Sequence, residues 1–562
     1  MLKKWIEKLH IPFNELDKKL WIIGILLFLV IRFTNLTIIP IFTDEAIYIR
    51  WSEIAWKPNL ERLGEARTSI FIPLSDGKQP LYMWLAGIPM QFTTDHLWAG
   101  RLPAIFAGLF AMIGLWLVTY ELFKRKKIAY IASAVYIVLP FTVLYDRMML
   151  ADSMLAMWGI WSLYLSILLV KTRSMKVAIA LGVVYGLGLL TKSPALFYIL
   201  LTPLSLIFFN NITRDGHLEP KNLQFWKWKK PEWSQLLGLG YLWGIAVVIG
   251  QLFQGILRIS NMYHMIGRKN LEFVLTSQEF LERPFSLFYG NLIGTSNWFY
   301  QYLGAALVIC IVVALVTALV KRDMRIALLT LLVIIPWFGS ISMAKVLYPR
   351  YLLFFTPPLL IIIAYGIYTI TNLINTHTIR YLKHYHHRLI LQAVVVLAIF
   401  STSIMTSYQI LFNPPAAKLA LQDREQYIVG WPSGYGVDQI TEFLMKEYKE
   451  KGKLAVGTEG TFGLMPFALQ IKFYDEIYNQ PGSNEKLFID GYWPFDRVPQ
   501  KIVELAAGRP TYFVVYQTEK DPPPEFPLEL VMKIEKPGGQ ASMRLYKVTP
   551  VWRYTPEGVI KN

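Results

Sequence analysis

The sequence of 562 residues predicts a polytopic α-helical membrane protein with a soluble C-terminal α/β domain. First, 54% of the residues are hydrophobic and 17% are charged, whereas soluble domains carry about a quarter charged residues. Second, uncharged runs of about 20 residues, long enough to cross a bilayer, recur as far as Phe412. Third, the remaining residues, 413–562, alternate between helix-like and strand-like patterns.

The net charge of +17 belongs to the apolar part of the chain. Residues 1–412 contain 38 Lys and Arg against 20 Asp and Glu, a balance of +18, whereas residues 413–562 contain 18 against 19. Because the excess lies between apolar runs, it does not indicate a nucleic-acid partner. The 31 Tyr, 33 Phe, 18 Trp and single Cys exclude a disordered or disulfide-stapled protein.

The apolar runs predict eleven membrane spans, near residues 20–36, 97–119, 128–144, 150–170, 177–193, 194–210, 234–257, 301–320, 326–343, 352–372 and 389–411. With Met1 in the cytoplasm, the cytoplasmic segments hold 23 basic and 8 acidic residues, and the outer segments of the membrane part hold 15 and 12. This asymmetry follows the positive-inside rule. It predicts a cell-membrane protein with a cytoplasmic N-terminus, an uncleaved first span acting as a signal anchor, and an extracytoplasmic domain at 413–562.

Two long outer segments, residues 37–96 and 258–300, interrupt this pattern. The stretches Glu45–Trp56 and Leu81–Phe92 are typical of amphipathic helices lying along the interface. Ionisable residues also gather at the outer ends of the spans, where they are costly without a partner or a role. They are Asp44, Glu45, Lys78, Arg101, Asp146, Arg147, Asp152, Lys192, Arg258, Arg268, Lys269, Lys345 and Arg350. We expect them to share one cavity at the outer face.

Each of these residues also has a structural interpretation. The pair Asp146–Arg147 suits an ion pair at a helix end, Lys192 suits a snorkelling side chain, and Arg101 suits a helix anchor. The adjacent acids Asp44–Glu45 suit helix capping. The convergence of several cations on two acids favours a functional site over all of these interpretations taken together.

The types of residue at the outer ends of the spans limit the reactions that the site could perform. Cations beside a tyrosine-rich rim suit a phosphate at membrane depth, such as a polyprenyl phosphate. A nearby carboxylate could deprotonate an acceptor, and positive charge could stabilise the phosphate leaving group. One base and a cationic clamp suffice for inverting glycosyl transfer, whereas glycoside hydrolysis needs two carboxylates. A Walker phosphate loop is missing from the sequence, which disfavours ATP-driven transport.

Six sequence blocks carry a resemblance to a known family. In chain order they are FTDEAIYIRW, DGKQPLYMWL, GRLPAIFAGL, YDRMMLADSML, GLGLLTKSPAL and AKVLYPRYLLFFTPP. Together they resemble the polyprenyl-phosphate-sugar glycosyltransferases of the GT-C superfamily, in the group of protein O-mannosyltransferases and the lipid A aminoarabinose transferase (glycosyltransferase family 39). Gln79 replaces the first Pro of one family motif, and two extra residues separate Lys345 from Pro349. Residues 413–562 match no part of the family.

The resemblance implies a role for each site residue. Asp44 would be the general base, and Glu45 would assist it or bind the acceptor. The donor phosphate would be held by Lys78, Tyr351, Arg258 or Arg268, and by Lys345 and Arg350. The cavity would be lined by Arg101, Asp146, Arg147, Asp152 and Lys192. The implied donor is a polyprenyl phosphate carrying one sugar, the acceptor is an unidentified protein, lipid or glycan, and neither a metal nor another cofactor is implied.

The tail is expected to form a separate domain. Val437–Glu450 predicts an amphipathic helix, and four segments predict strands: Lys453–Thr458, Thr511–Gln517, Leu528–Ile534 and Met543–Val548. The domain could cover the active site or recruit the acceptor. Two other functions stay open: a transporter or flippase of a lipid-linked sugar, for which the expected inverted repeats are not evident, and a scaffold that presents the tail. The run His384, His386, His387 favours a basic lipid-facing loop over a metal site.

Overall fold

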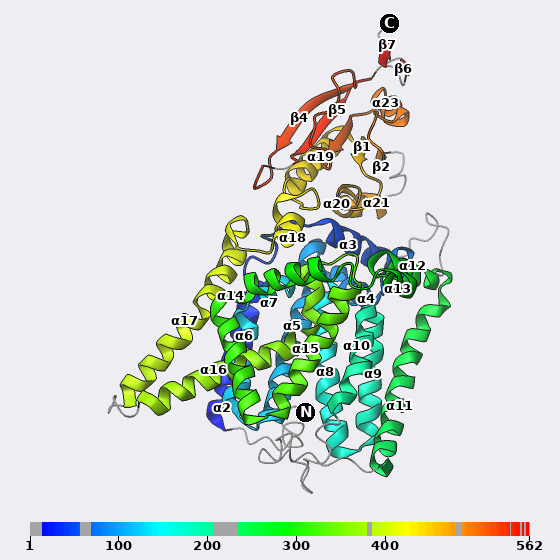
Figure 1. The fold of residues 1–562 in the computed structure, drawn as a ribbon. Helices are drawn as coiled ribbons and strands as arrows, with labels where there is room; N and C mark the ends of the chain where they lie inside the picture. Colours follow the sequence, from blue (N-terminus) through cyan, green and yellow to red (C-terminus); the bar gives the residue numbers. More distant parts are fainter. Residues whose placement is uncertain are drawn as a thin grey trace.

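A bundle of long helices carries a small sheet domain at one of its ends (Figure 1). The computed structural model describes residues 14–56, 69–205, 233–378, 385–478, 486–539, 541–550, 553–555 and 558–560. Several predicted features lie outside these residues: the basic residues Lys3, Lys4 and Lys8, the end of the span at 206–210, the cytoplasmic loop Arg214–Lys230, and His384.

The helices of the bundle follow the predicted spans. They are α2 (Glu15–Phe33), α5 (His96–Phe123), α6 (Lys126–Val138), α7 (Pro140–Tyr145), α8 (Ala151–Thr172), α9 (Met175–Thr191), α10 (Leu196–Leu201), α11 (Trp233–Gly255), α14 (Phe288–Lys321), α15 (Met324–Met343), α16 (Thr356–Thr378) and α17 (Tyr385–Phe412). Seven helices among the described residues are long and apolar enough to cross a membrane. The chain is therefore a multi-pass membrane protein. The count of eleven spans stays a prediction, since the other four spans hold shorter helices or, in α2, a helix with charged ends.

Two predicted spans are interrupted in the structure. The span at 128–144 is divided after Val138, because Pro140 lacks the N–H that would continue the helix and instead begins α7. Helix α14 begins at Phe288, well before the predicted start at residue 301, and it is interrupted at Gly304, whose φ is 70°. The predicted outer loop is shorter as a result and contains η8 (Ile256–Ile259), η9 (Asn261–Tyr263), α12 (His264–Phe273) and α13 (Ser277–Glu282).

The first outer segment lies at the end of the bundle that faces the sheet domain (Figure 1). It forms α3 (Thr43–Trp56), η2 (Ser69–Asp76), α4 (Leu81–Gly87) and η3 (Pro89–Phe92). The two helices occur where they were predicted, but the amphipathic interpretation of α3 is wrong, because residues 45–55 are buried except for residue 54. The tail covers this helix: Arg50 Nε donates to Gln470 Oε1 over 2.9 Å, and the rings of Trp51 and Phe462 are 6.2 Å apart.

The tail domain is built on a five-stranded sheet in the order β2-β1-β3-β5-β4. Its strands are β1 (Leu454–Glu459), β2 (Leu487–Tyr492), β3 (Thr511–Val515), β4 (Leu528–Ile534) and β5 (Met543–Val548). Strand β1 is parallel to β2 and β3, and β5 is antiparallel to β3 and β4. The helices are α19 (Val437–Lys451), α20 (Leu464–Lys472), α21 (Tyr474–Tyr478) and α23 (Gln500–Ala506), followed by the hairpin of β6 (Arg553–Thr555) and β7 (Gly558–Ile560). The four predicted strands occur within two residues of their predicted ends, whereas β2 was missed.

A connecting segment joins α17 to the tail domain across the end of the bundle. It contains η11 (Pro414–Ala416), α18 (Leu421–Arg424) and η12 (Glu425–Val429), and it ends where α19 begins. In the bundle, two short turns face the same end: η4 (Ser193–Ala195), after α9, and η10 (Pro349–Phe355), before α16. Arg350 and Tyr351 lie in η10, Asp423 lies in α18, and Lys192 directly precedes η4.

Candidate functional site

An ion pair between Asp44 and Arg350 lies at the centre of the candidate site. Asp44 is in the first turn of α3, and its Oδ2 is 2.7 Å from Nη2 of Arg350, which is in η10. The aspartate side chain is 25% exposed and the arginine side chain 7%. Nη1 of Arg350 is buried without a hydrogen-bond partner among the described residues. The pair therefore offers a reachable carboxylate and an unused N–H donor.

Two lysines add positive charge around this pair. Lys192 follows α9 and pairs with Asp152 of α8 over 2.7 Å, and its ammonium group lies 4.3 Å from the centre of the Tyr351 ring. Lys78, which follows η2, holds its ammonium group 5.7 Å from the centre of the Phe273 ring. Rings that face ammonium groups in this way stabilise them without neutralising their charge.

The cations set the ionisation of Asp44. Helix α3 lies outside the spanning helices, and burial alone would raise the pKa of its aspartate. The charges of Arg350, Lys78 and Lys192 outweigh burial and hold the pKa of Asp44 below its ordinary value. The carboxylate is therefore ionised, and it stays a weak base for as long as Arg350 remains paired with it.

Asp423 of α18 is a site residue that sequence reasoning missed. It is fully buried, and its Oδ2 accepts hydrogen bonds from the hydroxyl groups of Tyr145, over 2.5 Å, and Tyr302. Its Oδ1 has no hydrogen-bond partner among the described residues. Burial raises the pKa of this carboxyl to about 6, although both tyrosines and Arg350 act to lower it. In the sequence, Asp423 is indistinguishable from any other charged residue of a polar connecting segment.

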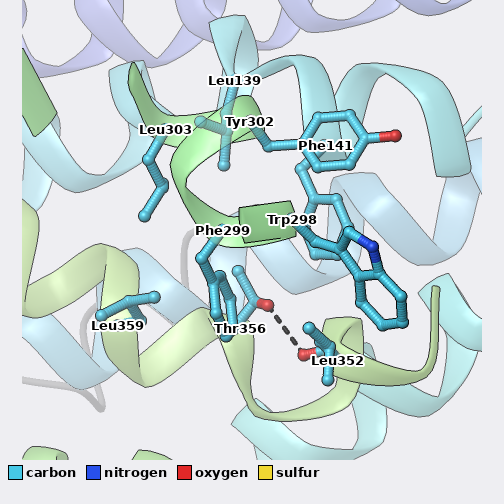
Figure 2. A pocket seen from close by; sticks show the side chains of 9 residues that line it. All are labelled: Leu139, Phe141, Trp298, Phe299, Tyr302, Leu303, Leu352, Thr356 and Leu359. Atoms are coloured by element: carbon cyan, nitrogen blue, oxygen red, sulfur yellow. Dashed lines mark hydrogen bonds between the residues drawn. The ribbon is translucent and has the colours of Figure 1, made fainter. Parts of the chain in front are cut away.

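An apolar pocket adjoins this part of the site. Figure 2 shows its lining: Leu139, Phe141, Trp298, Phe299, Tyr302, Leu303, Leu352, Thr356 and Leu359, around a space that holds little more than one water molecule. Trp298 donates its indole N–H to Gln422 in α18, and Tyr302 donates to Asp423, so the pocket wall is tied to the connecting segment. A second apolar pocket, between α8, α10 and α15, is also bordered by η10. Apolar space therefore flanks the turn that carries Arg350 and Tyr351.

Glu45 and Arg101 form a closed pair away from any open space. The carboxylate of Glu45 is fully buried and accepts from Nε and Nη2 of Arg101 over 2.8 and 2.6 Å, and from the Met149 N–H over 2.7 Å. Nη1 of Arg101 donates to the Leu36 carbonyl over 2.7 Å. The geometry favours the helix-anchor interpretation of Arg101. It also encloses Glu45 in a buried ion pair, which favours a structural role for this residue.

Replacing Glu45 with Gln is expected to destabilise the protein without removing its chemistry. Breaking a buried ion pair leaves an uncompensated charge and costs about 3–5 kcal/mol. The unfolding temperature in detergent should fall clearly, while the activity per folded molecule should stay within a few-fold of that of the wild type. A large loss of activity at an unchanged unfolding temperature would restore Glu45 to the catalytic residues.

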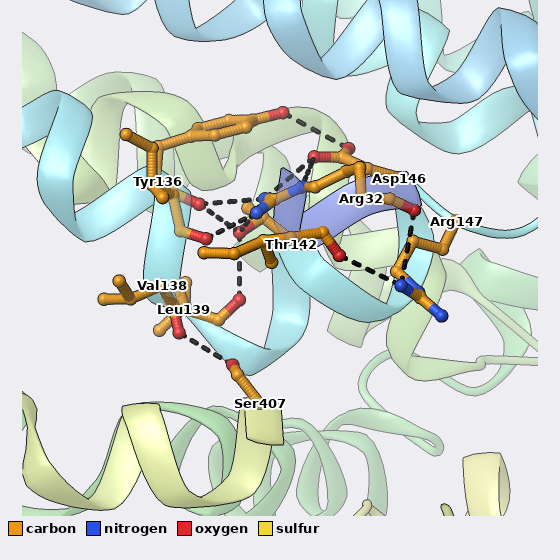
Figure 3. A network of polar contacts seen from close by, with 10 residues as sticks. Arg32, Tyr136, Val138, Leu139, Thr142, Asp146, Arg147 and Ser407 are labelled. Carbon is orange, nitrogen blue, oxygen red and sulfur yellow. Dashed lines mark hydrogen bonds and ion pairs between the residues drawn. The ribbon is translucent and has the colours of Figure 1, made fainter. Parts of the chain in front are cut away.

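Asp146 and Arg147 are structural, but they do not pair with one another (Figure 3). Asp146 instead pairs with Arg32 of α2, with its Oδ2 3.1 Å from Nη2, and both side chains are fully buried. Arg147 donates to the Thr34 and Asn35 carbonyls over 2.5 and 2.7 Å. Unsatisfied carbonyls at a helix end commonly take such donors. Both residues therefore fasten the end of α2, and their place in the lining of the cavity stays a prediction.

The remaining predicted cations have other contacts in the structure or are exposed. Lys345 pairs with Glu279 over 2.8 Å and donates to the Leu271 carbonyl over 3.2 Å. Arg258 and Arg268 are exposed, and Arg258 lies 5.4 Å from the centre of the Tyr263 ring. The structure thus gathers Asp44, Lys78, Asp152, Lys192, Arg350 and Tyr351, and leaves these three cations outside that group.

Lys269 is the cation of the second outer segment that lies beside Lys78. Its ammonium group is 2.9 Å from Asp76 Oδ1 and, like that of Lys78, 5.7 Å from the centre of the Phe273 ring. Gly77 allows this approach, because a Cβ at that position would lie 2.5 Å from Cβ of Lys269. Among the described residues, no group of three or more His, Cys, Asp or Glu side chains is placed to hold a metal ion.

Comparison with known proteins agrees with this architecture. Residues 77–219 match the family described as dolichyl-phosphate-mannose-protein mannosyltransferase. ArnT from Cupriavidus metallidurans bound to undecaprenyl phosphate has a TM-score of 0.52 at 13% identity, with 94% of this chain and 97% of that chain covered. Its apo structure gives a TM-score of 0.50 at 14% identity with the same coverage.

A second solved protein shares the fold. The archaeal oligosaccharyltransferase AglB from Archaeoglobus fulgidus, in complex with an inhibitory peptide and a dolichol-phosphate, has a TM-score of 0.50 at 13% identity, with 88% of this chain and 69% of that chain covered. No curated protein matches the sequence. The family match within the bundle and the fold shared over most of the chain confirm the resemblance to the GT-C superfamily of polyprenyl-phosphate-sugar glycosyltransferases.

Proposed function

We propose that this protein transfers a sugar from a polyprenyl-phosphate donor to an acceptor at the extracytoplasmic face, with inversion at the sugar carbon and with Asp44 as the general base. The observation that carries the proposal is the reachable carboxylate of Asp44 against the buried guanidinium of Arg350, with Lys78 and Lys192 close by. A single carboxylate can act as the general base in sugar transfer. The surrounding cations can stabilise the phosphate that leaves.

The donor phosphate is held by Arg350, Lys78 and Lys192. The unused Nη1 of Arg350 and the two ammonium groups supply charge-assisted hydrogen bonds, and the Tyr351 hydroxyl adds a neutral donor. The apolar side chains that line the two small pockets beside η10 offer the polyprenyl chain an apolar surface next to its phosphate. The undecaprenyl phosphate bound to ArnT and the dolichol-phosphate bound to AglB support a lipid of this class.

In the transfer step, an acceptor hydroxyl or amine attacks the sugar carbon on the face opposite the phosphate. The new bond to the acceptor forms as the bond between the sugar carbon and the phosphate oxygen breaks, and the acceptor proton moves to Asp44. Polyprenyl phosphate leaves as an anion, stabilised by the three cations, so it needs no general acid. Because the phosphate competes for Arg350, donor binding weakens the pair with Asp44 and strengthens the base when it is needed.

The side of the membrane and the first substrates to test follow from other observations. The loops with the basic excess lie opposite the tail in the predicted topology, which supports a tail and a site on the extracytoplasmic side. The family matched by residues 77–219 makes dolichyl-phosphate mannose with a protein acceptor the first pair to test. Aminoarabinose on undecaprenyl phosphate is the second donor. Neither a metal nor another cofactor is proposed.

Binding of undecaprenyl phosphate tests the clamp. In the double variant Lys78→Met/Lys192→Met, the Kd is expected to rise at least tenfold, because a hydrogen bond to a charged group contributes about 1.5–3 kcal/mol. The control Lys446→Met, on the exposed face of α19, should bind like the wild type. An unchanged Kd in the double variant would refute the clamp. Movement of the lipid across liposomes without sugar transfer to any acceptor would favour the flippase.

A further inference from the structure

A buried lysine of the tail organises the loop that touches the beginning of α3. Lys536 follows β4 and is 3% exposed. Its ammonium group donates to the carbonyls of Gly430, Trp431 and Ser433 over 3.1, 3.2 and 2.9 Å. These acceptors match the three donors of an ammonium group. Among the described residues the ammonium group of Lys536 is bonded only to these three carbonyls, and these bonds offset the cost of burying it.

The remaining carbonyl of this loop accepts hydrogen bonds from the first residue of α3. The Pro432 carbonyl accepts the Thr43 N–H over 3.0 Å and the Thr43 hydroxyl over 3.2 Å. Thr43 is the first residue of α3 and directly precedes Asp44. The first N–H groups of a helix have no partner within it, so a partner from outside fixes the helix end. The loop thus gives three carbonyls to Lys536 and the fourth to the residue before the base.

Close packing reinforces this contact. A Cβ at Gly434 would lie 1.7 Å from the Ile41 carbonyl oxygen, so the two backbones touch where no larger residue fits. The Phe42 ring meets the Tyr427 ring edge to face, with the ring centres 4.8 Å apart. The residues just before Asp44 are therefore held by the tail on three successive positions: 41, 42 and 43.

We propose that Lys536 is a positioning residue for Asp44. By holding the loop 430–433, it fixes the Pro432 carbonyl against Thr43 and so sets the place of the Asp44 carboxylate relative to Arg350. The catalytic consequence rests on the proposed function of Asp44, whereas the mechanical coupling between tail and helix does not. A displacement of about 1 Å in a reacting group can cost on the order of a hundredfold in rate.

Hydrogen–deuterium exchange of the full-length protein in detergent tests the coupling. Lys536→Met is expected to raise exchange in residues 41–48 several-fold while β1 and β3 keep their protection. The matched control Lys533→Met changes an exposed lysine on the same hairpin and should leave residues 41–48 unchanged. If Lys536→Met unfolds the sheet, Thr43→Val tests the contact from the bundle side, with increased exchange expected in 428–434. Unchanged exchange in Thr43→Val, or in a folded Lys536→Met variant, would overturn the coupling.

Kinetics with dolichyl-phosphate mannose as the probe donor test the consequence. Lys536→Met and Thr43→Val are expected to lower kcat at least tenfold and to leave KM for the donor within about twofold, since the phosphate clamp is untouched. A merely structural role would lower the amount of folded protein and leave its kcat unchanged, and that result would overturn the positioning role. If Asp44→Asn keeps full activity, the proposed base is wrong, and the exchange data still decide the coupling.

Discussion

Replacing Asp44 with Asn is expected to lower the rate of sugar transfer by about 10²–10⁴-fold, the usual contribution of a general base. Asparagine has nearly the same shape and can still accept a hydrogen bond from Arg350, but it cannot take the acceptor proton. The loss should therefore fall on kcat. Undecaprenyl phosphate should bind at least as tightly as to the wild type, because the carboxylate that competes with the phosphate for Arg350 is gone.

The measurement compares initial rates of transfer from dolichyl-phosphate mannose by purified variants of equal unfolding temperature. Asp496→Asn, on an exposed part of the tail, is the matched control and should behave like the wild type. Activity of Asp44→Asn within a few-fold of wild type would exclude this residue as the base. Loss of undecaprenyl phosphate binding together with activity would instead assign Asp44 to the architecture of the donor site.

Replacing Arg350 with Gln is expected to lower kcat/KM by about a hundredfold and to move the acid limb of its pH profile upward. The guanidinium contributes charge-assisted bonds to the phosphate, and losing one such bond costs about 1.5–3 kcal/mol. It also holds the pKa of Asp44 down against the effect of burial. Without it, less positive charge lowers the pKa of Asp44, so Asp44 takes up its proton at a higher pH than in the wild type and the base is lost earlier as the pH falls.

Profiles of kcat/KM against pH for the wild type and Arg350→Gln test whether Arg350 controls the ionisation of Asp44. An acid limb displaced to higher pH supports the pairing seen in the structure. Coincident normalised profiles, or a displacement to lower pH, would contradict the link between Arg350 and the ionisation of Asp44. Arg497→Gln, another exposed position in the tail, serves as the control and should leave both the rate and the profile unchanged.

The bundle was predictable from the sequence, since long uncharged runs have few other structures open to them. The partners of its charged residues were not. Asp44 and Glu45 are adjacent and look alike in the sequence, yet successive residues of a helix point about 100° apart. One side chain therefore faces the clamp and the other is enclosed with Arg101. No pattern in the sequence distinguishes two acids that only the packing of α3 separates.

Two places where the sequence departs from the family motifs proved to be structurally distinctive. The contacts that the residues there make could not be derived from the sequence. The resemblance assigned both Lys345 and Arg350 to the donor phosphate, although two extra residues separate Lys345 from Pro349. In the structure Lys345 turns to Glu279, and Arg350 reaches Asp44. Gln79, the other departure, donates to the Ser193 hydroxyl over 2.7 Å and thereby links the end of η2 to η4. Long-range partners of this kind depend on tertiary packing, which local sequence patterns do not record.

The burial of Asp423 between Tyr145 and Tyr302 bears on the order in which the protein is made. Both tyrosines belong to helices translated before Asp423, and their buried hydroxyl groups find their acceptor only in a residue that follows α17, the last helix of the bundle. A nascent chain that has inserted every helix still lacks this acceptor and the loop that holds Thr43. The end of the bundle that faces the sheet domain is thus completed only in the final part of synthesis, when Asp423 and the loop 430–433 are made.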